Sequence, residues 1–276
     1  KYLSMATSKE ENQFIQKIRR ITDVGNEPLE FLAAITGFEQ KPIVSIEKAI
    51  ESLVPIIEHI ELQTGAAKAM CQRSIKDLTL DEAVSIKLYT MEWSPVSLYT
   101  RLNETLRMKD RKKLAPWFSY LKLFFVALDR IPSTTGQQLF RGVKEDLSSR
   151  YVKGTSIVWW GFSSCTISED VLESDVFYGT TGKRTKFIID CNSGKKIKDY
   201  SYMPDEDEVL ILPATQFQVT DVIQPEPDVS EIYLKEIDSC AFRPQLPELV
   251  SLFDMIYKST LLSSLSYPLF PSLYQY

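Results

Sequence analysis

The spacing of apolar residues changes near residue 130 and divides this chain into two parts. In the first part, apolar residues recur every three or four positions, which is the period of an α-helix that buries one face. We therefore expect residues 1–130 to form a helical region. Its most apolar stretch, Trp117–Leu128, should be buried on most of its faces.

Two helix starts can be placed within this region. Ser45 stands before an apolar helical pattern, so we expect it to cap a helix that runs as far as Leu62 and carries His59 on its surface. Thr79 and Glu82 have the spacing of a capping box, in which each side chain accepts a hydrogen bond from the other residue's backbone N–H. This pair predicts the second helix start.

After Pro132 the pattern changes to short runs of β-branched and aromatic residues, separated by Pro, Gly, Ser and Asp. The expected strands are residues 139–143, 156–162, 186–190, 208–213, 216–223 and 231–237. Their length and spacing favour a mainly antiparallel β-sandwich over a doubly wound sheet. The predicted fold is therefore α+β, with a β core over residues 131–240 and a C-terminal helix and tail over residues 241–276.

Composition and charge narrow the class of protein. With 44% hydrophobic and 25% charged residues, the chain has the composition of a globular protein. Its net charge of −5 argues against a nucleic-acid partner held by a broad basic surface, and we interpret the basic residues within 109–113 as a solvated helix end. No apolar run approaches the ~18 residues of a transmembrane helix, so no membrane partner is expected.

Cysteine and histidine content limits the chemistry that the chain can perform. The four cysteines stand far apart without neighbouring histidines, so we expect reduced thiols and no metal site. The N-terminal residues lack the apolar stretch of a signal peptide, which predicts a cytoplasmic protein, or one secreted or translocated without a visible signal. Because His59 is the one histidine, catalysis is expected to use carboxylate, hydroxyl, lysine or arginine side chains.

Three polar positions in the β-rich part occur in an order that suggests a site. Arg141 lies on an expected strand and precedes Gly142, and Phe162-Ser163-Ser164-Cys165-Thr166 ends the aromatic strand. Glu206-Asp207-Glu208 directly precedes the apolar run Val209–Leu212. A polar residue at a strand end is common on its own, so the order and context of the three carry the interpretation.

In this order the residues resemble the arginine–serine–glutamate class of mono-ADP-ribosyltransferases, which includes vertebrate arginine-specific ectoenzymes and several bacterial toxins. That family has an arginine on an early strand, an aromatic-x-Ser-Thr-Ser strand, and Glu-x-Glu before Val-Leu. The chain departs from the pattern at Cys165 and Thr166, although Thr166 keeps a hydroxyl group. The resemblance extends through Phe217–Val219 and includes upstream residues such as Asn103 and Arg107.

The resemblance implies that NAD+ is a substrate and that its ribose–nicotinamide bond breaks through an oxocarbenium-like state. Glu208 would bind the ribose 2′-OH and stabilise the developing cation, and Ser164 would position Glu208 and the ribose. Arg141 would hold the phosphates with its planar fork, and the backbone of Gly142 would approach the nicotinamide amide. Because nicotinamide leaves as a neutral group, this chemistry needs no general acid.

Glu206 indicates which side chain accepts the ADP-ribose. In the family, a glutamate two positions before the catalytic glutamate accompanies arginine modification, since a carboxylate accepts paired hydrogen bonds from a guanidinium and assists its deprotonation. The expected acceptor is a protein with an accessible arginine, and Tyr200 or Tyr202 would pack on it. Phe177 would stack on nicotinamide and Arg184 would meet a phosphate. An NAD+ glycohydrolase and a non-catalytic NAD-binding or interaction module stay open as alternatives.

Overall fold

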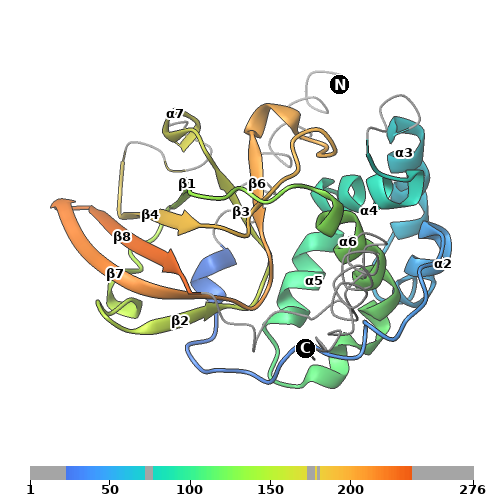
Figure 1. The fold of residues 1–276 in the computed structure, drawn as a ribbon, viewed down its shortest axis with the longest axis horizontal. Helices are drawn as coiled ribbons and strands as arrows, with labels where there is room; N and C mark the ends of the chain where they lie inside the picture. Colours follow the sequence, from blue (N-terminus) through green and yellow to red (C-terminus); the bar gives the residue numbers. More distant parts are fainter. Residues whose placement is uncertain (1–22, 72–76, 173–177, 179–180, 238–276) are drawn as a thin grey trace, which may run out of the picture. The chain divides into compact units, whose positions relative to one another are not determined.

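Helices make up the first part of the described chain and strands the second (Figure 1). The computed structural model describes residues 23–71, 77–172, 178 and 181–237. The expected C-terminal helix and tail, residues 241–276, lie outside the described residues. Among the residues that are described, no helix has both the length and the apolar character needed to cross a membrane.

The first part of the chain is built from short helices that pack on one another. The helical elements of the described chain are η1 (Asp23–Asn26), α2 (Ile46–Ile50), η2 (Glu51–Leu53), α3 (Ile60–Cys71), α4 (Leu80–Thr90), α5 (Leu98–Leu106), η3 (Arg111–Trp117), α6 (Phe118–Arg130), η4 (Ser148–Arg150), α7 (Glu169–Leu172) and η5 (Pro204–Glu206). Helix α6 packs against α2 and α4. Every α6 residue from Tyr120 to Leu128 is buried, which confirms the prediction from the apolar run.

Both predicted helix starts are confirmed. Thr79 Oγ1 accepts from the backbone N–H of Glu82 at 3.3 Å, and Glu82 Oε2 accepts from the backbone N–H of Thr79 at 2.9 Å. Ser45 Oγ accepts from the backbone N–H of Lys48 at 3.4 Å. These side chains give partners to N–H groups that have none within the first helical turn.

The helix that begins after Ser45 is shorter than predicted. Helix α2 ends at Ile50, and α3 begins only at Ile60. Pro55 falls between them and supplies no backbone N–H, so an α-helix cannot run through this position without losing a hydrogen bond. His59 therefore does not lie on a helix face; it has a left-handed φ of 65° directly before α3.

The second part of the chain forms one sheet. The strands are β1 (Gln137–Val143), β2 (Ser156–Trp159), β3 (Ser163–Thr166), β4 (Arg184–Cys191), β5 (Lys195–Lys196), β6 (Glu208–Ile211), β7 (Thr215–Glu226) and β8 (Val229–Glu236). The 8-stranded sheet has the order β2-β7-β8-β4-β1-β3-β6-β5. Strands β4 and β8 run parallel, and the other pairs are antiparallel. The fold is α+β with a mainly antiparallel sheet, as predicted.

This sheet curves around a buried cluster of hydrophobic side chains. Trp159 on β2 and Ile211 on β6 come from distant positions in the strand order, yet both belong to one buried cluster that also contains Phe187 on β4. A flat sheet would keep these side chains apart, so the sheet curves over itself. The expected sandwich thus takes the form of one continuous sheet whose two halves share the core.

The aromatic run expected as one strand over residues 156–162 forms strand β2 only as far as Trp159, and residues 160–162 form the turn that leads to β3. Strand β2 stops at Trp159 and pairs with β7, whereas β3 starts at Ser163 and pairs with β1 and β6. The turn between them is held from the helical region, because Asn103 Oδ1 accepts from the backbone N–H of Phe162 at 2.9 Å. The Phe162 ring also lies 5.1 Å from the Phe124 ring on α6, measured between centroids.

Arg111 departs from the solvated helix end predicted for residues 109–113. Its guanidinium lies 4.6 Å from the centroid of the Trp160 ring and donates to the backbone carbonyl of Ala33 at 2.8 Å. A planar guanidinium can stack on an aromatic ring and donate from its edge at the same time. Arg111 therefore joins the helical region to the turn between β2 and β3.

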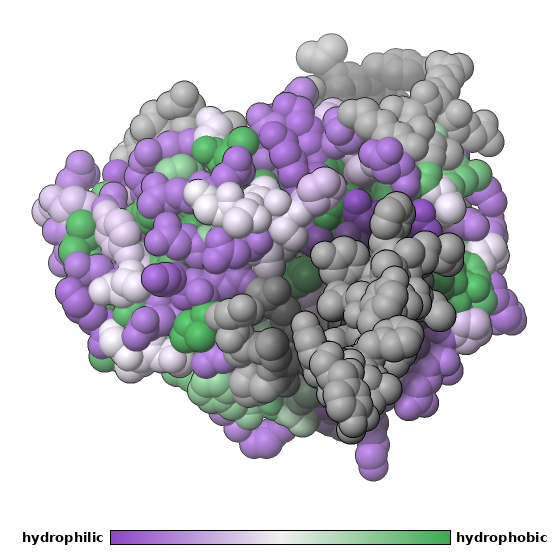
Figure 2. All heavy atoms as spheres, in the orientation of Figure 1, coloured by the Kyte–Doolittle hydropathy of each residue, from purple (hydrophilic) through white to green (hydrophobic). Residues whose placement is uncertain are grey.

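The face drawn in Figure 2 is mainly hydrophilic, with hydrophobic residues in small groups between the polar ones. Apolar side chains scattered over a protein surface in this way are ordinary. Buried polar groups are less common, because each must find a hydrogen-bond or ion-pair partner when it leaves water. The buried polar groups of the sheet are therefore the better indication of a site.

Candidate active site

Ser164 and Glu208 face each other across two neighbouring strands. Strands β3 and β6 are antiparallel, with Ser164 opposite Leu210 and Thr166 opposite Glu208. Side chains of opposite residues lie on the same face, so Ser164 and Glu208 are diagonal neighbours on that face. Ser164 Oγ donates to Glu208 Oε1 at 2.6 Å. Glu208 is 2% exposed, so its carboxylate is held by protein groups rather than by bulk water.

Arg141 reaches the same place from β1, the other neighbour of β3. Its Nη1 donates to the backbone carbonyl of Ser164 at 2.6 Å, and its Nη2 forms an ion pair with Asp23 at 2.5 Å. The side chain is buried, with 2% of it exposed. The structure thus brings Arg141, Ser164 and Glu208 together, with the guanidinium engaged by Asp23 and the Ser164 backbone rather than open to solvent.

The turn that leads into Glu208 is held by helix α4. Lys87 Nζ donates to the backbone carbonyl of Ser201 at 2.6 Å, and Thr90 Oγ1 accepts from the backbone N–H of Tyr202 at 2.8 Å. Ser201 Oγ lies 3.4 Å from Glu208 Oε2. These contacts explain how a helix far away in sequence can position the segment before the candidate catalytic glutamate.

The same turn separates the two tyrosines named in the sequence prediction. Tyr200 is buried with 7% exposed, whereas Tyr202 is 37% exposed. Glu206 is the last residue of η5, and Asp207 follows with a left-handed φ of 44° and an ion pair to Lys198 at 2.7 Å. Of the two tyrosines, Tyr202 is the one that a partner protein can touch.

Gly142 and Arg184 meet at a residue that the sequence prediction missed, Tyr178. A Cβ atom on Gly142 would lie 2.9 Å from the Cβ of Tyr178, so only glycine leaves room for that side chain. The guanidinium of Arg184 lies 5.2 Å from the centroid of the Tyr178 ring. Phe177 lies outside the described residues. The aromatic pair Phe177-Tyr178 was the available sequence signal, and the prediction used only its first member.

Cys165 lies next to Ser164 and is buried. Burial raises the pKa of its thiol to about 12, so the group is protonated at neutral pH. Of the described cysteines, Cys71, Cys165 and Cys191 are free. Within the described ranges, no group of three or more His, Cys, Asp or Glu side chains is arranged to hold a metal ion.

Two further polar residues at the site, Ser201 and Asp23, were not predicted from the sequence. Ser201 is close to Glu206 along the chain, and this proximity was the signal that could have found it. Asp23 reaches Arg141 across a separation of 118 residues. No spacing or motif in the sequence connects these two positions.

Residues 43–241, which are most of the chain, match the family described as NAD:arginine ADP-ribosyltransferase. The chain belongs to the NAD:arginine ADP-ribosyltransferase family. Glu206, Glu208, Arg141 and Ser164 all fall inside the matched stretch. Asp23 falls outside it.

Characterised members of the ADP-ribosyltransferase family include similar proteins from vertebrates. The chain is 32% identical over 152 residues to the erythroblast NAD(P)(+)–arginine ADP-ribosyltransferase of Gallus gallus, which is 52% of this chain and 47% of that protein. It is 29% identical over 168 residues to the GPI-linked NAD(P)(+)–arginine ADP-ribosyltransferase 1 of Oryctolagus cuniculus, which is 57% of this chain and 48% of that protein. The chain thus spans about half the length of these relatives.

A solved member of the ADP-ribosyltransferase family has the same fold. A variant of the eukaryotic mono-ADP-ribosyltransferase ART2.2 in complex with NADH matches with a TM-score of 0.56 and 21% identity. The match covers 75% of this chain and 94% of that chain. At this level of identity the comparison supports the α+β architecture described above and not a particular activity.

Proposed function

We propose that the protein transfers ADP-ribose from NAD+ to the side chain of an arginine in an acceptor protein and releases nicotinamide. The observation that carries the proposal is the hydrogen bond of 2.6 Å between Ser164 Oγ and Glu208 Oε1, beside a buried Arg141. These residues occur in the order expected of a family that acts on NAD and arginine. The proposal involves neither a nucleic acid nor a membrane.

Glu208 would act on the sugar of NAD+. As the C1′–N bond to nicotinamide breaks, its electron pair leaves with the neutral nicotinamide and positive charge develops on the ribose. A preorganised carboxylate beside that charge stabilises the transition state by about 3–4 kcal/mol, by analogy with an oxyanion hole of opposite sign. The Ser164 hydroxyl fixes one carboxylate oxygen. Because a neutral group leaves, the step requires no metal and no general acid.

Glu206 would act on the acceptor. A guanidinium nitrogen attacks C1′, the C–N glycosidic bond forms, and the nitrogen gives up a proton that the Glu206 carboxylate accepts. Tyr202, which is 37% exposed in the turn before Glu206, would pack on the acceptor protein. The relatives named above are arginine ADP-ribosyltransferases, which supports this choice of acceptor.

Arg141, Gly142 and Arg184 would form the dinucleotide side of the site. Arg141 would hold strand β3 in place by donating a hydrogen bond to the Ser164 carbonyl. Gly142, which has no side chain, would leave room for the side chain of Tyr178. Arg184 would meet a phosphate of NAD+. We further propose the organisation expected from sequence, with a helical region over residues 1–130, a catalytic core over 131–240 and a C-terminal helix and tail over 241–276.

The test is incubation of the protein with NAD+ labelled in the adenosine part, with and without agmatine as an arginine analogue. We expect label on agmatine, and release of nicotinamide that rises when agmatine is present. Equal nicotinamide release in both reactions, with no labelled agmatine, identifies an NAD+ glycohydrolase instead. Binding of NAD+ without nicotinamide release identifies a non-catalytic module.

A further inference from the structure

Asp23 and Glu27 lie at the start of the described chain, before residue 43, where the match to the family begins. Both are acidic side chains with little exposure, at 14% and 5% respectively. Two buried arginines face them, Arg107 from the end of α5 and Arg141 from β1. Two carboxylates thus neutralise two guanidinium groups in a place where an unpaired charge would be costly.

Asp23 is the centre of this cluster. Its Oδ1 lies 2.5 Å from Arg141 Nη2, and its Oδ2 lies 2.8 Å from Arg107 Nη2. Asn103 Nδ2 also donates to Asp23 Oδ2 at 3.1 Å. Arg141 in turn donates to the backbone carbonyl of Ser164 at 2.6 Å. A chain of hydrogen bonds therefore runs from Asp23 through Arg141 to the strand that carries Ser164.

Glu27 holds the turn that leads into this strand. Its Oε2 accepts from the backbone N–H of Trp160 at 2.6 Å, and its Oε1 accepts from Arg107 Nε at 2.6 Å. Burial raises the pKa of Glu27, although the neighbouring Arg107 opposes the shift. Burial alone would lower the pKa of Arg107, but Asp23 and Glu27 together raise it. Asp23 pairs with both arginines and Glu27 pairs with Arg107, so the four side chains form one ion-paired cluster.

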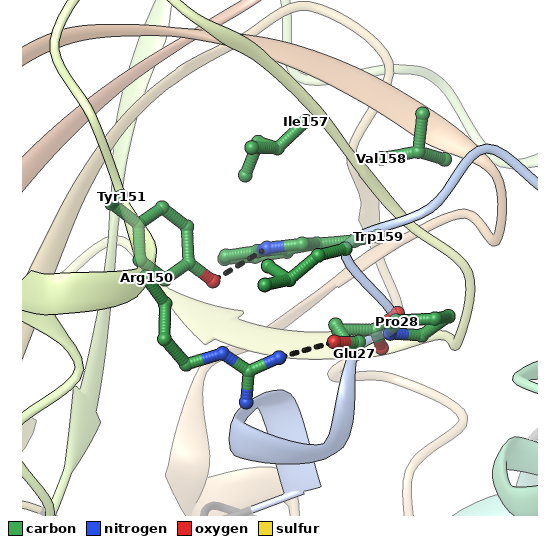
Figure 3. A pocket seen from close by; sticks show the side chains of 8 residues that line it. Glu27, Pro28, Arg150, Tyr151, Ile157, Val158 and Trp159 are labelled. Atoms are coloured by element: carbon green, nitrogen blue, oxygen red, sulfur yellow. Dashed lines mark hydrogen bonds between the residues drawn. The ribbon is translucent and has the colours of Figure 1, made fainter.

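The backbone that carries Glu27 is bound by Arg150 of η4 at a small pocket (Figure 3). Arg150 points at Glu27 and donates to its backbone carbonyl, and it also donates to the carbonyl of Gly25. In the same pocket, Trp159 Nε1 donates to the hydroxyl of Tyr151 at 3.1 Å. Arg150 therefore binds the segment that presents Asp23 and Glu27 at two of its backbone carbonyls.

We infer that Asp23 is a positioning residue, which holds Arg141 so that the β3 strand presents Ser164 to Glu208. The inference rests on the proposed function, because it assigns Asp23 a part in the same site. Asp23 lies outside residues 43–241, which match the family, and yet full activity of the site would depend on it. The competing possibility is that Asp23 pairs with the Arg141 guanidinium in place of the NAD+ phosphates. In that case Asp23 would oppose the binding of NAD+.

The first experiment compares Asp23→Asn with Asp221→Asn. Both changes remove one carboxylate charge and keep the side-chain size, and Asp221 pairs with Lys153 at 3.0 Å away from the site. We expect Asp23→Asn to lower kcat for agmatine modification by about 10-fold or more, as for loss of a charged hydrogen bond. The KM for NAD+ should change by less than about twofold, and Asp221→Asn should keep both values.

A double-mutant cycle separates positioning from a general loss of folding. Ser164→Ala removes the hydroxyl that Asp23 is inferred to position, so Asp23→Asn should lower kcat much less in the Ser164→Ala protein than in the wild type. A purely structural role would lower the folded fraction, and hence activity, equally in both backgrounds. Equal effects in the two backgrounds overturn the inference.

A second variant covers the case in which Asp23→Asn does not fold. Asp23→Glu keeps the charge balance of the cluster, while its extra methylene group displaces Arg141. We expect a folded protein with a lowered kcat. Wild-type kcat in either folded variant overturns the inference, and so does a lowered KM for NAD+ with unchanged kcat, which identifies Asp23 as a competitor of the phosphates. Lack of agmatine labelling by the wild type instead rejects the proposed function itself.

Discussion

Ser164 Oγ donates a hydrogen bond of 2.6 Å to Glu208 Oε1, across the neighbouring strands β3 and β6. This hydrogen bond fixes the orientation of one carboxylate oxygen of Glu208. Groups that are already oriented require little reorganisation as charge develops in a reaction, which is the main source of electrostatic catalysis.

The charge of Glu208 is the first quantity to test. Glu208→Gln keeps the shape of the side chain and can still accept a hydrogen bond from Ser164, but it removes the negative charge. We expect transfer to agmatine to fall by at least about 100-fold, with little change in melting temperature. Glu104→Gln, on the exposed face of α5, is the matched control and should keep wild-type rates. Equal labelling by Glu208→Gln and the wild type would reject Glu208 as the catalytic carboxylate.

The two hydroxyl groups near Glu208 should contribute unequally. Ser164 Oγ lies 2.6 Å from Glu208 Oε1, whereas Ser201 Oγ lies 3.4 Å from Glu208 Oε2. A short hydrogen bond to a charged group contributes about 1.5–3 kcal/mol, so Ser164→Ala should lower kcat by about 10- to 100-fold. Ser201→Ala should have a smaller effect. Initial rates at saturating NAD+ give the comparison, and the reverse order contradicts the assignment.

Local signals in the sequence predicted the parts of the fold that depend on neighbouring residues. The capping box of Thr79 and Glu82 involves residues three positions apart, and α6 is specified by its own apolar run. The apolar pattern alone wrongly predicted one helix from Ser45 to Leu62, because it takes no account of Pro55, which interrupts the helix. That error was avoidable, since the proline is visible in the sequence.

Other features could not be predicted, because they depend on contacts between distant residues. The end of β2 at Trp159 and the turn over residues 160–162 depend on Glu27 and Asn103, which bind the backbone of the turn from far away in sequence. The ordered motif names Arg141, Ser164 and Glu208 as candidates, and the fold brings these three together. It could not indicate Asp23, since a single aspartate with no periodic neighbours has no sequence signature.

Glu206 should separate transfer to arginine from cleavage of NAD+. Glu206→Gln removes the proposed proton acceptor for the guanidinium and leaves Glu208 in place. General-base contributions are about 100-fold or more, so labelled agmatine should fall by at least that factor. Nicotinamide release without agmatine should stay close to the wild-type rate. If both rates fall together, Glu206 acts on NAD+ and not on the acceptor.

The thiol of Cys165 should be unreactive in the folded protein. Burial raises the pKa of Cys165 to about 12, and burial together with Glu236 raises that of Cys191 to about 12. At pH 8 the reactive thiolate is therefore a minor form of both groups. Alkylation with iodoacetamide at pH 8, followed by peptide mass spectrometry, should leave both unmodified in the native protein. Both should react in urea, and labelling of native Cys165 contradicts the buried position.

Substitution of Gly161, with Gly65 as the control, tests the packing around the buried Arg107. A Cβ atom added at Gly161 would lie 2.6 Å from Arg107 Nη2, whereas one added at Gly65 in α3 meets nothing within 4 Å. Arg107 cannot easily move away, because it forms ion pairs with Asp23 at 2.8 Å and with Glu27 at 2.6 Å. Gly161→Ala should therefore destabilise the protein by about 1–3 kcal/mol, as overpacking of a core does.

Gly65→Ala should have the opposite effect on stability. Alanine has the higher helix propensity, by about 1 kcal/mol at an interior helical position, and the added methyl group meets no neighbour. Urea unfolding of both variants measures the two free energies directly. Because Gly161→Ala displaces Arg107 and with it Asp23, its folded fraction should also have a lowered kcat, while Gly65→Ala keeps the wild-type value. A stable and fully active Gly161→Ala protein would show that the arginine is free to move, and that the cluster around Asp23 does not support the site.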